Sequence, residues 1–194
     1  MSDLSDKSRI FIDGATIDDL DAIHAIEEAS FTAPWSRKAL EVELTNNPFA
    51  RVYVARDDRA MTPVGYVCFW LVFEELRMMN LAVLPSERRR RIGSALLWHA
   101  LTIGRTEGAR RALLEVRASN GPALALYERA GFRRTGLRNK YYANPVEDAV
   151  LMELDRIDCV RRPEGESSDE SNVECQPSRQ ATGSPPFFQP GGYR

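Results

Sequence analysis

The densest group of basic side chains in the sequence lies in residues 85–101, PSERRRRIGSALLWHAL, where four consecutive arginines precede Gly93 and an apolar segment. Such a run fits a nucleic-acid patch, a solvated charged loop, or a cradle for phosphate groups. The first turn of a helix offers unpaired N–H donors and the positive end of its dipole, and glycine allows close approach of the backbone. A nucleic-acid patch more often has further basic runs and exposed aromatic residues, which the flanking sequence lacks. We therefore favour a phosphate cradle, in which one or two of the arginines are only solvated.

A cradle of this kind needs a strand before it and a helix after it, and the apolar pattern predicts both. Residues 76–83 have the pattern of a strand, which Pro85 prevents from continuing, and a helix is predicted from Ile92 to about Glu107, before Gly108. Further strands are predicted at residues 9–15, 51–56, 64–73, 111–116 and 149–154, and further helices at residues 17–26, 37–45 and 121–130. This order predicts an α/β fold with helices on both faces of one sheet.

Composition limits the classes of function. The chain has 43% hydrophobic and 28% charged residues and a net charge of -2, so no overall field attracts it to nucleic acid or to a membrane. Its longest apolar run, VGYVCFWLVF, is about half the ~20 residues of a membrane helix, and the first residues lack the apolar segment of a signal peptide. Three widely spaced cysteines outside any C-x-x-C pattern argue against both a disulfide framework and a zinc site. We expect a cytoplasmic protein.

The composition changes near Arg156, after which serine, proline, glycine and charged residues dominate without an apolar period. Such a segment buries too little surface to offset the entropy lost on ordering. The sequence therefore predicts a folded domain over residues 1–155 and a disordered tail over residues 156–194.

With these elements assigned, the arginine turn resembles the motif R/Q-x-x-G-x-G/A of the GCN5-related N-acetyltransferases (GNAT), which cradles the pyrophosphate of acetyl-CoA. Arg88, Ile92 and Gly93 match this motif, whereas Arg91 stands at its first glycine. Other segments are similar to the RimI branch of the family, which acts on the N-terminal alanine of a small-subunit ribosomal protein: FTAPWS (31–36), NLAV (80–83), LEVRASNGPALALYERAGF (114–132), RNKYY (138–142) and EDAVLM (147–152). The resemblance covers residues 10–154 and implies the GNAT fold, with a mixed central β-sheet and helices on both faces.

Attack of an amine on a thioester needs a base for the ammonium, a donor for the oxyanion and an acid for the departing thiolate. The resemblance implies that Glu115 accepts the proton, directly or through water. The residues alone also allow Glu115 to be a strand-end glutamate that pairs with Arg117 or another arginine.

Tyr127 lies in the predicted helix 121–130, where a tyrosine usually packs into the core with its hydroxyl at the rim. The resemblance implies instead that Tyr127 protonates the CoA sulfur. A phenol with an ordinary pKa of ~10 is protonated at neutral pH and can donate as charge develops on a thiolate.

The implied cosubstrate is acetyl-CoA, without a metal. The strand NLAV is expected to offer main-chain hydrogen bonds to the pantetheine arm and an N–H to the thioester oxygen. Asn120 caps the helix that follows it, and in the family this position also contacts the cofactor. The cofactor-binding residues are then Leu81, Ala82, Val83, Arg88, Arg89, Arg90, Arg91, Ile92, Gly93, Ser94 and Asn120.

The acceptor groove is expected to lie between FTAPWS and RNKYY, with Trp35, Tyr141 and Tyr142 as large amphipathic contacts. Glu74 and Glu75 end a predicted strand, where they either attract a basic peptide or form a solvated hairpin end.

Three functions remain open at this point: a protein N-terminal acetyltransferase, an acetyltransferase for lysine or a small amine, and a non-catalytic acyl-CoA-binding module. The third predicts loss of the acid or the base, yet Glu115 and Tyr127 are both present. The first is favoured by the RimI resemblance, with a ribosomal protein N-terminus as partner and no direct contact with nucleic acid or membrane.

Overall fold

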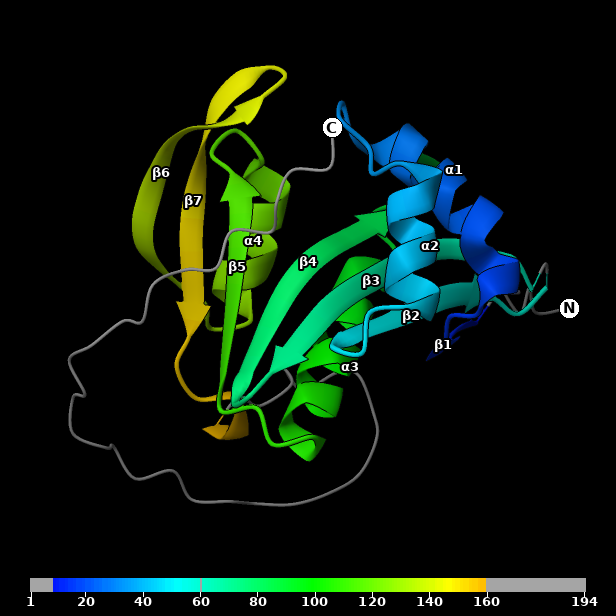
Figure 1. The fold of residues 1–194 in the computed structure, drawn as a ribbon, viewed down its shortest axis with the longest axis horizontal. Helices are drawn as coiled ribbons and strands as arrows, with labels where there is room; N and C mark the ends of the chain where they lie inside the picture. The colour runs from blue at the N-terminus through cyan, green and yellow to red at the C-terminus, as the bar shows by residue number, and fades with distance from the viewer. Residues whose placement is uncertain (1–8, 60, 160–194) are drawn as a thin grey trace, which may run out of the picture.

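The computed structural model describes residues 9–59 and 61–159, which form a seven-stranded sheet with helices on both faces (Figure 1). The strands lie in the order β1-β2-β3-β4-β5-β7-β6, and all neighbours are antiparallel except β4 and β5. The strands are β1 (Ile10–Gly14), β2 (Ala50–Asp57), β3 (Pro63–Val72), β4 (Glu75–Val83), β5 (Arg111–Arg117), β6 (Arg133–Ala143) and β7 (Val146–Leu154). The helices are α1 (Leu20–Ser30), α2 (Arg37–Thr45), α3 (Ile92–Thr106) and α4 (Gly121–Arg129), with short 3-10 turns η1 (Ile17–Asp19), η2 (Pro85–Glu87) and η3 (Ile157–Cys159).

Every strand and helix predicted from the apolar pattern is present, and the mixed sheet with helices on both faces is confirmed. The sequence analysis missed one strand, β6, which carries the RNKYY segment. Most residues of β6 are exposed, and the strand lies at the sheet edge with β7 as its neighbour. An exposed edge strand needs no apolar alternation, so periodicity does not reveal it.

Two apolar cores lie on opposite faces of the sheet. On one face α1 and α2 pack through Leu20, Ile23 and Leu40 against Tyr66 and neighbouring strand residues. On the other face the larger core joins α3 and α4 to β3, β4, β5 and β7. Figure 1 shows α1 and α2 in front of β2 to β4, with α3 behind them. The sheet is therefore the middle layer of three.

A β-bulge in β4 changes which core its residues face. Cys68 pairs with Asn80 and Phe69 with Met78, so Met79 is an extra residue in β4. Before the bulge Met78 belongs to the larger core with α3, and after it Ala82 belongs to the core with α1. A bulge inserted here therefore redirects the side chains of the segment that continues into the arginine turn.

β4 and β5 pair only near their beginnings. Their parallel register covers Glu75–Arg111, Leu76–Ala112 and Arg77–Leu113, and the two strands then part (Figure 1). The later residues of β4, including the NLAV segment, lie beyond this parallel register with β5, which leaves this side of the strand for other partners.

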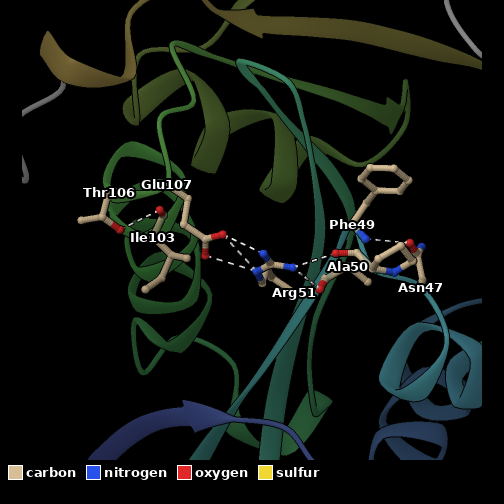
Figure 2. A network of polar contacts seen from close by, with 8 residues as sticks. Asn47, Phe49, Ala50, Arg51, Ile103, Thr106 and Glu107 are labelled. Carbon is tan, nitrogen blue, oxygen red and sulfur yellow. Dashed lines mark hydrogen bonds and ion pairs between the residues drawn. The ribbon is translucent and has the colours of Figure 1, made fainter.

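The far end of α3 is held to β2 by a bidentate ion pair (Figure 2). Arg51 donates from Nε and Nη2 to the Glu107 carboxylate, with a distance of 2.7 Å between Nη2 and Oε2. Arg51 Nη1 also donates to the main-chain oxygens of Pro48 and Ala50, at 3.1 and 3.0 Å. These contacts fix the C-terminal end of α3 on the sheet. The N-terminal end of the same helix begins directly after the arginine turn.

The packed structure continues slightly beyond the predicted domain end at residue 155. Ile157 is 2% exposed, and its N–H donates to the Arg110 main-chain oxygen at 3.0 Å. The rest of the predicted tail, residues 160–194, lies outside the described residues. Across the described part of the chain, no helix has the length and apolar character needed to span a membrane.

Candidate active site

The arginine run forms the turn between β4 and α3, as the sequence predicted. After η2 the chain enters α3, with Arg91 as its N-cap residue. The N–H of Ala95 donates to the Arg91 oxygen at 3.0 Å and begins the helical ladder. The N–H groups of Ile92, Gly93 and Ser94 precede this bond, and such groups suit an anionic ligand.

Arg91 keeps the backbone conformation that the motif glycine would favour. Its φ is 62°, in the left-handed region, and Arg89 has a φ of 65°. This conformation costs an L-residue roughly 1–2 kcal/mol, and glycine adopts it freely. The departure from the GNAT motif at Arg91 therefore changes the side chain, while the turn geometry that presents the helix N-terminus is retained.

The four arginines do not have equal roles in the turn. Arg88 donates from Nε to the Val83 oxygen at 3.1 Å and so closes the turn on the end of β4. Arg90 pairs with Glu87 and with Asp57 of β2, the latter at 3.4 Å. Arg90 therefore braces the turn through ion pairs within its own chain, which differs from the expected solvated arginine, and its contact with the cofactor stays a prediction.

Gly93 is not required by the packing of the protein itself. A Cβ atom built on Gly93 would lie 3.6 Å from Leu81 Cδ2 and 3.7 Å from Leu126 Cδ2, which are ordinary contacts. The neighbouring protein atoms would thus accept an alanine, in agreement with the G/A choice of the motif. A small residue at this helix start leaves room beside the N–H donors.

Glu115 of β5 is bound by residues of the missed strand β6. Arg138 Nη1 lies 2.9 Å from Glu115 Oε1, and the Glu115 side chain is 22% exposed. Tyr141 hydrogen bonds to Glu115, and burial together with this bond raises the pKa of Tyr141 to about 12. The guanidinium of Arg138 also lies 5.1 Å from the centre of the Tyr141 ring. The arginine partner expected for Glu115 exists, and it is Arg138.

Tyr127 of α4 is buried, at 7% exposed, and its ring packs edge-on against Phe132 with centroids 5.7 Å apart. Burial raises the pKa of Tyr127 well above its ordinary value, and the neighbouring Tyr142 adds to the shift. The phenol is therefore protonated throughout the physiological range. Both expectations from the sequence are compatible here, because a core tyrosine can also hold a proton to donate.

Tyr142 connects the two residues expected to move protons. Burial, and after it the charge of Glu115, raise the pKa of Tyr142 to about 12, while Tyr142 in turn acts on Tyr127. Arg117 lies 4.1 Å above the centre of the Tyr142 ring and pairs with Glu147 at 3.3 Å. The structure thus gathers Glu115, Tyr127 and Tyr142 into one group of neighbouring side chains.

Asn120 caps α4, since its side-chain oxygen accepts from the Ala123 N–H at 3.2 Å. The capping prediction is confirmed, whereas the expected contact between Asn120 and the cofactor stays a prediction.

The two segments expected to bind the acceptor meet at one point. Thr32, in FTAPWS, donates from its hydroxyl to the Asn144 oxygen at 3.2 Å, just beyond RNKYY. Arg117 Nη2 donates to the same oxygen at 2.9 Å. Trp35 packs partly buried against the core of α1 and α2, and Tyr141 is 38% exposed. The structure therefore joins the FTAPWS loop to the turn that follows RNKYY, beside the Glu115 group.

Glu74 and Glu75 lie apart from this group, where β4 begins. Glu74 pairs with Arg110 at 3.0 Å, and Glu75 pairs with Arg77 at 2.7 Å and with Arg111. Burial acts to raise the pKa of Glu75, but the hydrogen bonds from its two arginines bring it below its ordinary value. The structure does not bring these glutamates to the expected acceptor groove, because β4 carries its bulge and the NLAV segment away from them. We retain neither as an acceptor contact.

The chain matches the family model described as acetyltransferase (GNAT) family over residues 20–132. The chain belongs to the GNAT acetyltransferase family. This confirms the family, the fold and the N-acetyltransferase class that the arginine motif implied.

Relatives of this GNAT chain include two bacterial enzymes named ribosomal protein bS18-alanine N-acetyltransferase. The one from Salmonella typhimurium is 36% identical over 138 residues, covering 70% of this chain and 90% of the relative. The one from Escherichia coli strain K12 is 35% identical over 147 residues, with the same coverages. The crystal structure of the E. coli ribosomal-protein-S18-alanine N-acetyltransferase has a TM-score of 0.70 at 28% identity, covering 82% of this chain and all of that chain.

Sequence reasoning about the GNAT site missed two residues, Arg138 and Glu27. Arg138 appeared only as the first residue of RNKYY. Its pairing with Glu115 was not predicted, because β6 was not recognised as a strand. Glu27 lies on the apolar stripe of α1, four positions after Ile23 and seven after Leu20, and it is itself fully buried. A glutamate at an apolar helix position is the signal that would have identified it.

No group of three or more histidine, cysteine, aspartate or glutamate side chains with the arrangement of a metal site occurs within residues 9–59 and 61–159.

Proposed function

We propose that this GNAT chain is an acetyl-CoA-dependent N-terminal acetyltransferase that acts on the N-terminal alanine of ribosomal protein bS18. Two relatives named for this activity are 36% and 35% identical to the chain, which spans 90% of each. The structural observation that supports the proposal is the Glu115 carboxylate, held by Arg138 at 2.9 Å and by a hydrogen bond with Tyr141 on elements beside the parting of β4 and β5.

Acetyl-CoA, when bound, supplies the acetyl group as an activated thioester. The N–H groups of Ile92, Gly93 and Ser94 would hold its pyrophosphate, and the exposed Arg88, Arg89 and Arg91 would add positive charge around it. Two features of the turn suit a pyrophosphate: the left-handed backbone conformation of Arg91, and the absence of a side chain at Gly93. The main chain of Leu81, Ala82 and Val83 would pair with the pantetheine arm.

In this function Glu115 accepts a proton from the ammonium of the acceptor, directly or through water, and Tyr127 donates its phenolic proton to the departing sulfur. Arg138 and Tyr141 fix the Glu115 carboxylate in one orientation. Transfer is direct, from thioester to amine in a ternary complex. Trp35, Tyr141 and Tyr142 form the walls against which the acceptor peptide lies.

The experiment that tests this function is mass spectrometry of two peptides incubated with the purified protein and acetyl-CoA. One peptide has a free N-terminal alanine followed by the first residues of bS18, and the other is blocked at its α-amine but carries lysines. We expect acetylation of the free α-amine alone. Acetylation of lysine instead, or of neither peptide, would contradict the assignment and favour a GNAT enzyme for side chains or small amines.

We also propose that the reaction takes place in the cytoplasm, on a protein N-terminus, without direct contact with nucleic acid or membrane. The net charge of -2 provides no overall attraction to either. A nucleic-acid role for the arginine turn predicts duplex binding that weakens steeply with salt. We expect no such binding at physiological salt, and duplex binding that acetyl-CoA fails to displace would contradict the phosphate cradle.

A further inference from the structure

A fully buried carboxylate joins several segments of the candidate site but takes no part in the chemistry described above. Glu27 of α1 is 0% exposed. Its carboxylate accepts hydrogen bonds from the Tyr66 hydroxyl, from Asn80 Nδ2 at 2.8 Å and from the Trp35 N–H at 2.8 Å. Burial raises the pKa of Glu27, while the bonds from Tyr66 and Trp35 and the nearby His24 act in the opposite direction. Because no substrate can reach it, Glu27 acts only through its neighbours.

The donors to Glu27 come from the two substrate sides of the site. Asn80 directly follows the extra residue of the β4 bulge and begins the NLAV segment expected to hold the thioester. Trp35 belongs to FTAPWS, the segment expected to hold the acceptor. Tyr66 comes from β3 and pairs with Ala82, two residues beyond Asn80. One carboxylate therefore connects the cofactor strand with the acceptor loop.

Stability alone does not account for a glutamate at this position. Removing a carboxylate from water is costly, and an apolar side chain of similar volume usually stabilises a core at least as well. The surrounding residues Leu20, Ile23 and Ile26 of α1 already supply such packing. What an apolar side chain lacks is the ability to accept from a main-chain N–H and from Asn80 at once, which fixes both donors in position.

We propose that Glu27 is a positioning residue that locks the acceptor loop at Trp35 to the β4 bulge at Asn80, so that amine and thioester are held in register. This inference rests on the proposed acetyltransferase function. It predicts that loss of Glu27 reduces turnover. The hydrogen bonds of Glu27 go to Tyr66, Asn80 and Trp35 and not to the phosphate cradle, which should still bind acetyl-CoA.

The kinetic test compares Glu27→Leu with wild type on the N-terminal alanine peptide. We expect kcat to fall about 10–100-fold, the size of effect that a small misplacement of reacting groups produces, and the Kd for acetyl-CoA to stay within about threefold. Glu27→Gln, which keeps one acceptor oxygen, should restore part of the loss. Wild-type kcat in Glu27→Leu, or equal losses of turnover and acetyl-CoA binding in both variants, would overturn the inference.

The matched control is Glu28→Leu, the same substitution at the next position of α1, where the side chain is 63% exposed. Its turnover should equal that of wild type. A loss in Glu28→Leu as large as in Glu27→Leu would mean that any apolar change in α1 has this effect, which contradicts a specific role for Glu27.

Amide hydrogen exchange separates this inference from the proposed function, since it needs no acceptor. In Glu27→Leu, exchange at Trp35 and at Leu81 to Val83 should accelerate together, by at least about tenfold, relative to Glu28→Leu. If Glu27→Leu does not fold, Glu27→Gln should show the same paired change at smaller size. Acceleration at one segment only would refute the coupling, whereas inactivity of wild type on the peptide would refute only the proposed function.

Discussion

At the scale of single residues, the position of the Glu115 carboxylate is set by its neighbours. Arg138 and Tyr141 both bind its carboxylate, so its position is fixed before any acceptor arrives. An N-terminal ammonium with an ordinary pKa of ~8 still carries its proton at pH 6–7 and needs a base, whereas above pH 8 much of it is already neutral. The need for Glu115 should therefore depend on pH.

For Glu115→Gln we expect kcat to fall about 10²–10⁴-fold at pH 6.5 and much less at pH 9, since general base catalysis contributes on that order. Initial rates measured across this range provide the check. A loss of equal size at every pH would show that Glu115 serves mainly to bind or to fold.

Tyr127 differs from Glu115 in being buried, and burial keeps its phenol protonated. Tyr127→Phe removes the proton but keeps the ring that packs on Phe132. We expect kcat to fall at least about 10²-fold while the Kd for acetyl-CoA is unchanged. Measured binding by calorimetry and turnover by mass spectrometry should diverge accordingly, and unchanged turnover would exclude Tyr127 as the acid.

His99 of α3 provides a pH-dependent contribution to stability that is separate from catalysis. Its Nε2 is the one buried side-chain nitrogen or oxygen without a partner in the described part of the chain, and burial lowers its pKa. The folded protein therefore binds fewer protons at His99 than the unfolded chain does. Stability from this site is complete above the unfolded pKa of ~6.5 and declines as pH falls through it toward the lower folded pKa.

Denaturant unfolding at pH 7.5 and pH 5 tests this contribution. Lowering the pH should reduce the unfolding free energy of wild type more than that of His99→Gln, because glutamine does not titrate. A difference that is independent of pH would contradict the prediction.

At the scale of elements, β4 is the strand on which the two substrate sides depend, and its position is set by β3. A Cβ atom on Gly65 of β3 would lie 2.9 Å from the main-chain oxygen of Ala82. A main-chain atom cannot move aside without moving the strand. Gly65 therefore permits the close approach that holds the NLAV segment in place.

For Gly65→Ala we expect the unfolding free energy to drop by about 1–3 kcal/mol, as in other overpacked sites, together with weaker binding of acetyl-CoA. Gly14→Ala in β1 is the matched control, because a Cβ atom there would meet no atom within 4 Å. Chemical denaturation and acetyl-CoA titration of both variants measure the contrast. Equal stability of the two variants would contradict a steric role for Gly65.

At the scale of the whole molecule, the sheet separates two apolar cores formed by residues within 9–159. The core with α1 and α2 carries Trp35, and the core with α3 and α4 carries Tyr127. The hydrogen bond from the Thr32 hydroxyl to the Asn144 oxygen joins the loop after α1 to the turn between β6 and β7, beside the expected acceptor groove. Both halves of the candidate site thus lie on these cores, to which Ile157 of the predicted tail also contributes.

Cys159 is disulfide-bonded, so this test is made with a thiol reductant present. We then predict that a chain ending after Cys159 keeps its midpoint of thermal unfolding within about 4 °C of the full chain, equivalent to less than about 1 kcal/mol. Its turnover on the alanine peptide should also be unchanged. A large loss of either would show that residues 160–194 contribute to the domain, against the composition-based prediction.

The sequence by itself determined the elements and the cofactor motif. Apolar periodicity is a local signal, so the helices, six of the seven strands and the turn before α3 could be predicted from neighbouring residues. The GNAT motif and the identity of Glu115 and Tyr127 as candidates are likewise readable along the chain.

Only the tertiary structure decided which side chains meet. β6 escaped prediction because an exposed edge strand has no apolar alternation, and with it Arg138 escaped as the partner of Glu115. Glu74 and Glu75 lie where β4 begins, apart from the segments expected to bind the acceptor. Glu27 hydrogen bonds to Asn80, which is 53 positions away in the sequence. Contacts of this kind follow from sheet order, the β4 bulge and the parting of β4 from β5, which local pattern does not encode.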